Sequence, residues 1–269
     1  MTVEAEEGDI GRAWHLLWGD APPGAGRSRT RCVLFDFDGP ICRLFPEGSS
    51  REVADNLRDI LAEADFMDAL NEVERDDKDP HVVLRAVHRA GRQRDRDVKD
   101  LVRRLEAEVT KGELAALPDS LDTDNAAALI RCLRDSGLEL AVVTNNSPLA
   151  AAEYLRSKNL LDCFDAIHGR GADPDLMKPD PDVIERALND PHLSAAATEA
   201  VMIGDSPSDF DAARAAGVEF IGYARNADKL RRLRDAKAET VIGSYAPLLE
   251  RAREMAGAGA VPKGRRTAG

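Results

Sequence analysis

Short apolar runs alternate with amphipathic segments over most of the chain. Four of these runs are aliphatic or β-branched and end in polar residues or glycine, at 31–36, 138–144, 200–204 and 218–222, and 240–243 is a possible fifth. Buried strands of a parallel sheet read as continuous apolar runs, and the helices between them provide the crossovers. The pattern therefore predicts an α/β fold built on a parallel sheet.

The stretch from Pro46 to Pro118 has a different periodicity. It contains no strand-like run, and its apolar residues recur three and four positions apart, which places them on one face of a helix. Three such stripes are present: Val53, Leu57, Ile60 and Leu61; Val83, Ala86, Val87 and Ala90; and Val98, Leu101, Val102, Leu105 and Val109. Connections within a domain are usually far shorter than this block. We therefore interpret residues 46–118 as an inserted all-helical cap; the alternative is a long helical crossover within one domain.

The two ends of the chain differ from the body in composition. Residues 1–30 form an N-terminal extension that ends in a proline- and glycine-rich linker at 21–26. Within it, Trp14, Leu16, Leu17 and Trp18 predict a short helix packed on the body. Residues 257–269 are rich in glycine, alanine and basic residues and predict a flexible tail. The α/β core then comprises residues 31–45 and 119–256.

Charge and cysteine usage narrow the class of protein. The chain has 37 Lys and Arg against 49 Asp and Glu, a net charge of −12, which repels nucleic-acid phosphates and predicts no nucleic-acid partner. No apolar run approaches the roughly 20 residues that span a bilayer, and the acidic start is not a secretory signal, so no membrane partner is expected. The four cysteines form no CxxC pair and are expected to be reduced thiols of a cytoplasmic protein: Cys32, Cys42, Cys132 and Cys163.

Polar residues capable of chemistry follow the predicted strands. The carboxyl ends of parallel strands meet at one edge of a sheet, where ligands bind, so these residues are expected to converge. Two carboxylates two positions apart can hold a divalent cation or divide into nucleophile and acid. Each residue alone also has an ordinary explanation as a turn, a helix cap or a solvated charge. The candidates are Asp36 and Asp38, Thr144 and Asn145, Lys178 before a helix start, and Asp205 and Asp209.

In this order and spacing, the four motifs resemble the signature of the haloacid dehalogenase (HAD) superfamily over about residues 31–243. The Phe35-Asp36-x-Asp38-Gly39 start and the all-helical insertion are similar to the branch that contains phosphoglycolate phosphatase and β-phosphoglucomutase. The resemblance implies a Rossmann-like core with a helical cap. It departs from the branch at Pro40, which stands where an apolar residue or Thr is usual and which lacks an N–H. Dehalogenases of the family lack an Asp equivalent to Asp38, so the namesake activity is not expected.

The resemblance also implies a mechanism, that of a Mg²⁺-dependent phosphatase of a small phosphorylated metabolite. In this scheme Asp36 attacks phosphorus to form an aspartyl-phosphate, and Asp38 serves as general acid and then general base. Mg²⁺ is expected on Asp36, Asp205 and the backbone carbonyl of Asp38, with Asp209 outside this set of ligands. The phosphoryl oxygens are expected on Thr144, Asn145 and Lys178.

Two alternatives remain open at the level of sequence. A sugar phosphomutase of the β-phosphoglucomutase type would pass the same aspartyl-phosphate to a sugar instead of water. A phosphorylation-switched signalling module belongs to a different class, but receiver domains of that kind are about half as long and have no inserted cap. The sequence does not identify the substrate, and it allows a monomer or a homodimer.

Overall fold

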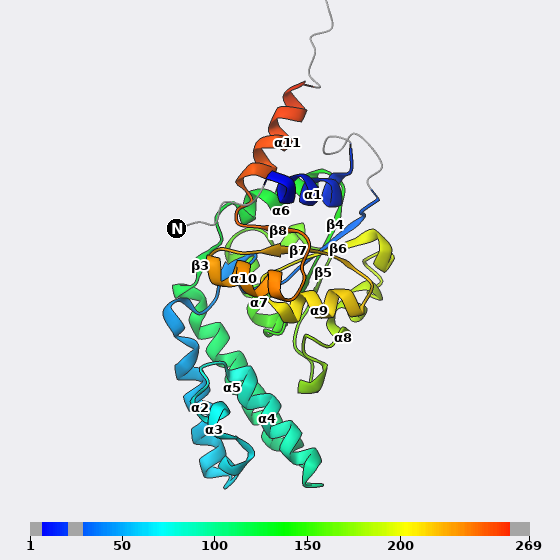
Figure 1. Ribbon diagram of the computed structural model, residues 1–269. Coiled ribbons are helices and arrows are strands. Elements are labelled where there is room, and N and C mark those ends of the chain that lie inside the picture. The colour runs from blue at the N-terminus through cyan, green and yellow to red at the C-terminus, as the bar shows by residue number, and fades with distance from the viewer. Residues whose placement is uncertain (1–6, 21–28, 259–269) are drawn as a thin grey trace, which may run out of the picture.

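The computed structural model describes residues 7–20 and 29–258, and its centre is a six-stranded parallel sheet (Figure 1). The strand order is β5-β4-β1-β6-β7-β8, and the strands are β1 (Cys32–Phe35), β4 (Glu139–Val143), β5 (Ala166–His168), β6 (Ala200–Gly204), β7 (Glu219–Tyr223) and β8 (Val241–Ile242). The parallel α/β fold predicted from the apolar runs is confirmed.

The register of the central strands brings their carboxyl ends level. Phe35, the last residue of β1, lies opposite Val142 of β4 and Ile203 of β6. The chain leaves all three strands within one or two residues of this line. The polar residues that follow the strands therefore lie along one edge of the sheet.

Helices cover both faces of this sheet. Successive strand residues point to opposite faces, and here the residues on both faces are apolar and buried. Val33 and Phe35 belong to one buried apolar cluster, whereas Cys32 and Leu34 belong to the other. The first cluster includes residues of α6 (Ala126–Asp135), α7 (Pro148–Ser157) and α11 (Ala246–Ala258). The second includes residues of α8 (Asp182–Leu188), α9 (Pro207–Ala215) and α10 (Ala227–Asp235). The result is a three-layer α/β core.

The predicted helix in the N-terminal extension is confirmed. Helix α1 (Glu7–Trp18) contacts β8 and α11, and it buries Trp14, Leu17 and Trp18 in the first apolar cluster. The proposed linker at 21–26 lies within 21–28, outside the described residues. Gly257 and Ala258 of the proposed tail are the last residues of α11, and 259–269 lie outside the described residues.

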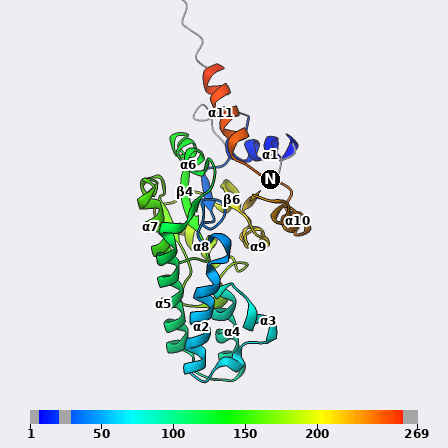
Figure 2. The same cartoon turned by 90° about the vertical axis from the view of Figure 1, so that its left-hand side faces the viewer.

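The inserted segment forms a separate helical layer beside the core (Figures 1 and 2). It consists of α2 (Ser50–Glu63), α3 (Glu72–Asp76), α4 (Pro80–Gln93) and α5 (Lys99–Ala116). The three predicted stripes lie on α2, α4 and α5 and contribute to an apolar cluster distinct from the two of the core. The chain enters and leaves this layer through an antiparallel pair, β2 (Cys42–Arg43) and β3 (Leu121–Asp122). We call α2–α5 the cap.

Several small elements were not predicted. Strand β5 has only two apolar residues and is half-buried at the edge of the sheet, and β2 and β3 are two residues each, so none has a readable pattern. Short 3₁₀ turns lie at Pro46–Gly48, Met67–Ala69, Leu117–Asp119, Leu161–Cys163, Pro174–Leu176 (η5) and Ala197–Glu199. Among the helices of the described residues, none has the length and apolar character needed to cross a membrane.

Candidate active site

Three buried aspartates meet at the carboxyl edge of the sheet. Asp36 follows β1, Asp205 follows β6, and Asp209 lies in the first turn of α9. Each offers a carboxylate oxygen, and these oxygens lie within 4.8 Å of one another. The three residues are only 7%, 6% and 2% exposed, respectively. Three of the candidate acids are therefore brought together in one buried cluster.

The glycine of the first motif is required by the close approach of Asp205. Gly39 has a φ of +123°, and a Cβ placed on it would lie 2.0 Å from Oδ2 of Asp205. No side chain fits that space, and residues other than glycine rarely adopt such a φ. The turn after β1 can therefore pack against Asp205 of the fourth motif only with glycine at this position.

Lys178 supplies the positive charge at the centre of the cluster. Its Nζ lies 2.7 Å from Oδ1 of Asp36 and 2.6 Å from Oδ1 of Asp209, and it donates to the carbonyl of Val143 at 3.0 Å. Burial alone would lower the pKa of this lysine, but Asp209 and Asp36 outweigh it and raise the pKa to about 12. Lys178 is therefore a fixed cation beside the predicted nucleophile.

Asp209 is saturated by protein donors. Its Oδ2 accepts hydrogen bonds from the amides of Asp205 and Ser206, both at 3.0 Å, and from the Ser206 hydroxyl at 2.7 Å. Its Oδ1 is held by Lys178. Burial would raise the pKa of Asp209, but Lys178 and the Ser206 hydroxyl hold it below its usual range. This geometry suits the expected role of Asp209 in orienting the other groups from outside the set of metal ligands.

Asp36 and Asp205 carry the uncompensated part of the negative charge. Burial and the charge of Asp209 raise the pKa of Asp36 to about 7, against the opposing effect of Lys178. Burial raises the pKa of Asp205 to about 6, although Lys229 opposes this and Asp209 adds to it. Hard carboxylate oxygens that repel one another at this spacing are the donor set that suits Mg²⁺. The residues present therefore fit the expected metal.

Asp38 is placed apart from the three clustered acids. Its side chain is partly exposed, and its Oδ1 accepts a hydrogen bond from the amide of Leu44 at 2.9 Å. Burial and the nearby charge of Asp36 raise the pKa of Asp38, and the Leu44 amide opposes this shift. A raised pKa suits a carboxyl group that must carry a proton near neutral pH.

The second motif divides into two tasks. The Thr144 hydroxyl donates to Oδ1 of Asn146 at 3.0 Å and accepts from the Asn146 amide at 3.1 Å. The Asn145 side chain instead holds the backbone of Lys178: its Nδ2 donates to the Lys178 carbonyl at 3.1 Å, and its Oδ1 accepts from the Lys178 amide at 2.8 Å. The expected phosphate contact by Asn145 thus stays a prediction for its backbone, because its side chain is occupied in positioning Lys178.

Two groups near the site were missed by sequence reasoning. The Nζ of Lys229 contacts Oδ2 of Asp205 and is held in place by α10, whose first turn is capped by Asn226. The position of α10 after β7, at the same sheet edge, was an available signal. Glu113 of the cap is fully buried against the loop after Thr144. Nothing in the local pattern of α5 distinguishes it from the solvated charges around it.

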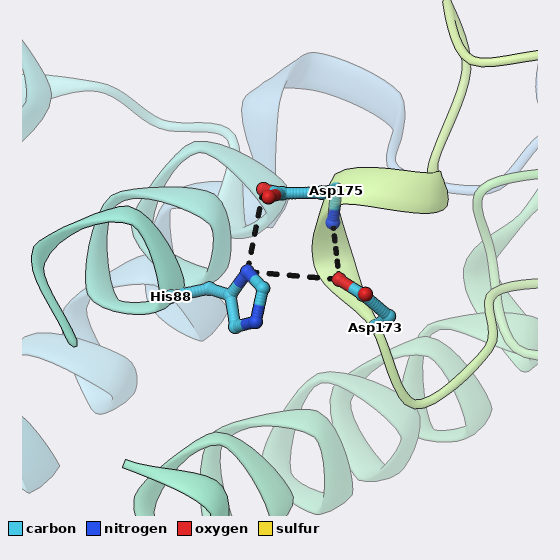
Figure 3. A group of neighbouring side chains, drawn as sticks. All are labelled: His88, Asp173 and Asp175. Carbon is cyan, nitrogen blue, oxygen red and sulfur yellow. Dashed lines mark hydrogen bonds and ion pairs between the residues drawn. The ribbon is translucent and has the colours of Figure 1, made fainter. Parts of the chain in front are cut away.

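A second cluster joins the cap to the core farther along α4. The Nδ1 of His88 lies 3.3 Å from Oδ1 of Asp175 and 3.6 Å from Oδ1 of Asp173, and these aspartates lie at η5 and just before it (Figure 3). Arg92, one turn along α4, also pairs with Asp175. His88 is half-buried, and Asp173 and Asp175 are exposed. These contacts connect the cap to the segment that leads to Lys178.

The site thus consists of clustered aspartates and a buried lysine at the carboxyl edge of an α/β core, which is joined to an inserted helical cap. The family model described as haloacid dehalogenase-like hydrolase matches residues 30–217. The chain therefore belongs to the haloacid dehalogenase-like hydrolase family.

Individual relatives share parts of the chain. The phosphoglycolate phosphatase of Rhodospirillum rubrum is 32% identical over 207 residues, which cover 72% of this chain and 81% of that protein. The phosphoglycolate phosphatase of Neisseria meningitidis is 37% identical over 101 residues, and the match spans only 40% of its length. The structure of CbbY from Rhodobacter sphaeroides in complex with phosphate has a TM-score of 0.58 at 22% identity, covering 81% of this chain and 96% of that chain. At this identity the structural likeness shows the fold alone.

Proposed function

We propose that this protein is a Mg²⁺-dependent phosphatase that hydrolyses a small phosphorylated metabolite of the phosphoglycolate type through an aspartyl-phosphate. The observation that carries the proposal is the buried triad in which Lys178 lies between Asp36 and Asp209. The phosphoglycolate phosphatase of R. rubrum, which matches over most of its length, supports the choice of substrate class.

The chemistry follows from the placement of each group. An oxygen of Asp36 attacks phosphorus, the P–O bond to the alcohol breaks, and Asp38 gives its proton to the departing oxygen. Asp38 then takes a proton from water, which attacks the phosphorus and releases phosphate from Asp36. Lys178 and the Thr144 hydroxyl offset the charge on the phosphoryl oxygens. Mg²⁺ held by Asp36, Asp205 and the Asp38 carbonyl would supply the charge neutralisation that lets an anionic nucleophile approach a phosphate.

The test is phosphate release across a panel of phosphometabolites, with Mg²⁺ or with EDTA. We expect Mg²⁺-dependent release that Asp36→Asn abolishes. Asp211→Asn is the matched control, because Asp211 lies on α9 near Asp209, and its ion-pair partner among the described residues is the exposed Arg214. A product that retains its phosphate at a new position would indicate the phosphomutase instead. Wild-type turnover by Asp36→Asn would refute the mechanism.

A further inference from the structure

The junction between cap and core contains a fully buried arginine. The side chain of Arg170, in the loop after β5, is 0% exposed. Its Nη1 donates to Oε1 of Glu113 at 3.1 Å and to the carbonyl of Asn145 at 2.8 Å. Its Nη2 donates to Glu106 at 3.1 Å and to the Thr110 hydroxyl at 3.2 Å. One core residue thus contacts three residues of α5 and the second motif at once.

Glu113, the buried partner of this arginine, hydrogen-bonds to the loop that carries Thr144. Glu113 is 0% exposed; its Oε1 accepts from Nδ2 of Asn146 at 3.0 Å, and its Oε2 accepts from the amide of Ser147 at 2.9 Å. Asn146 in turn hydrogen-bonds to the Thr144 hydroxyl in both directions. A continuous chain of hydrogen bonds therefore runs from the cap carboxylate to the hydroxyl expected to bind phosphate.

A buried ion pair is poor evidence for a purely stabilising role. Removing two charges from water costs as much as their attraction returns in many proteins, and apolar residues of the same size often serve stability equally well. The buried pair instead fixes the orientation of its neighbours. Oε1 of Glu113 accepts from Asn146 and Arg170, and Oε2 accepts from the amide of Ser147. Thr144, Asn146 and Ser147 are thereby held in one arrangement.

We propose that Glu113 of the cap is a positioning residue for the phosphate-binding loop 144–147, acting through Asn146 and Ser147. The inference rests on the proposed phosphatase function, since it assigns the loop to phosphate. It gives the cap a further role: α5 sets the geometry of a loop that belongs to the core.

Glu113→Asp separates the effect of side-chain length from the effect of the negative charge. Aspartate keeps the negative charge near Arg170 but is shorter by one methylene, which withdraws the oxygens from Asn146 and Ser147. We expect the inhibition constant of inorganic phosphate and the KM for p-nitrophenyl phosphate to rise about 10- to 100-fold, the usual effect of losing hydrogen bonds to a charged group. A change in kcat alone would contradict positioning through phosphate binding.

Glu106→Asp is the matched control. Glu106 lies on the same helix and pairs with the same arginine, but within the part of the chain that the structure describes its hydrogen bonds go to Arg170 and Thr110 and not to loop 144–147. We expect its phosphate inhibition constant to change by less than about threefold, because the loop keeps its partners. Equal effects of the two variants would overturn the proposal and leave Glu113 as a counter-ion of Arg170 only.

Amide hydrogen exchange gives a readout that needs no activity. In Glu113→Asp the Ser147 amide loses its acceptor, so the peptide that contains 144–148 should exchange faster, while the peptide at 183–188 in α8 should not. Unchanged exchange in 144–148 would overturn the positioning role even if the wild-type protein hydrolyses no phosphate ester. An inactive wild type would refute the phosphatase function. Faster exchange in the variant would still support the contact between Glu113 and the Ser147 amide.

Discussion

Asp38 and Asp36 are two residues apart, yet their surroundings differ, as the different tasks proposed for them require. Asp36 is buried with Asp209 and Lys178, whereas Asp38 faces Leu44 and is partly exposed. The motif spacing predicted both residues, because a strand followed by two carboxylates can be read from the chain. The partner of each carboxylate could not be predicted, because Leu44 and Lys178 approach through the fold.

Asp38→Asn tests the division of tasks. The variant keeps the nucleophile but lacks the acid and base, so alkyl phosphates should fail at the first step. A nitrophenolate leaves without a proton, so p-nitrophenyl phosphate should give a stoichiometric burst followed by turnover about 10²–10⁴-fold slower than wild type. Mass spectrometry should find the phosphate on the Asp36 peptide. Label on another residue would contradict the assignment of the nucleophile.

Gly39→Ala tests the close approach of the first and fourth motifs. The Cβ would collide with Asp205 and impose an unfavourable φ, which costs about 1–3 kcal/mol in backbone strain alone. We expect a lower free energy of unfolding in urea and loss of Mg²⁺-dependent activity. Gly11→Ala is the control, because a Cβ there meets nothing within 4 Å. Equal stability of the two variants would show that the turn after β1 adapts easily.

At the scale of elements, helices with capping signals and the two-residue strand β8, within the possible strand at 240–243, were predictable, whereas β2, β3 and β5 were not. Two helix-start patterns can be read from the chain, Ser206 before Pro207 and Ser147 before Pro148, and α9 and α7 begin at them, because a cap satisfies amides within one turn. Strand β5 pairs only with β4 and depends on that neighbour. The contact between α5 and loop 144–147 joins residues more than 30 positions apart, so no local pattern reports it.

The junction between α4 and α5 should give the protein a pH-dependent stability. Burial alone would lower the pKa of His81, but the charge of Asp79 and hydrogen bonds with Asp79 and Glu113 raise it to about 9. A raised pKa means that the folded state binds the proton more tightly, so this stabilisation is complete below about pH 6.5 and is lost as the pH rises through 9.

His81→Gln tests this dependence by removing the titrating group. Urea unfolding of the wild type should lose up to about 3 kcal/mol between pH 6.5 and 9.5 that the variant does not lose, since one pKa unit corresponds to about 1.4 kcal/mol. His192→Gln is the control, because His192 is exposed. Parallel pH profiles of wild type and His81→Gln would show that His81 stays neutral.

At the scale of the whole molecule, the carboxyl edge of the sheet brings together negative carboxylates, and a bound cation would reduce their repulsion. Burial with Asp209 raises the pKa of Asp36 to about 7 and that of Asp205 to about 6. A raised carboxyl pKa stabilises the fold only while the group is protonated, so the metal-free protein should lose stability as the pH rises from 4 through 7. Mg²⁺ binding should offset this loss above pH 7.

Thermal unfolding with EDTA or with Mg²⁺ at pH 5 and pH 8 checks this expectation. Ligand binding to the folded state raises the melting temperature, and we expect the increase caused by Mg²⁺ to be larger at pH 8. Asp205→Asn should reduce the increase, and Asp182→Asn, a control outside the cluster, should not. An equal increase in wild type and Asp205→Asn would place the cation elsewhere.

The paired strands β2 and β3 make the cap exchangeable in principle. Because Arg43 lies opposite Leu121, the insertion leaves and rejoins the core at neighbouring points, and from the core it is equivalent to one long hairpin loop. A foreign helical insert could be grafted between these two residues without changing the path of the sheet. To keep loop 144–147 in the same arrangement, however, such a chimera would have to bring a carboxylate of its own to Nδ2 of Asn146 and the amide of Ser147. New substrate specificities obtained by exchanging caps would therefore depend on preserving a carboxylate in the position of Glu113.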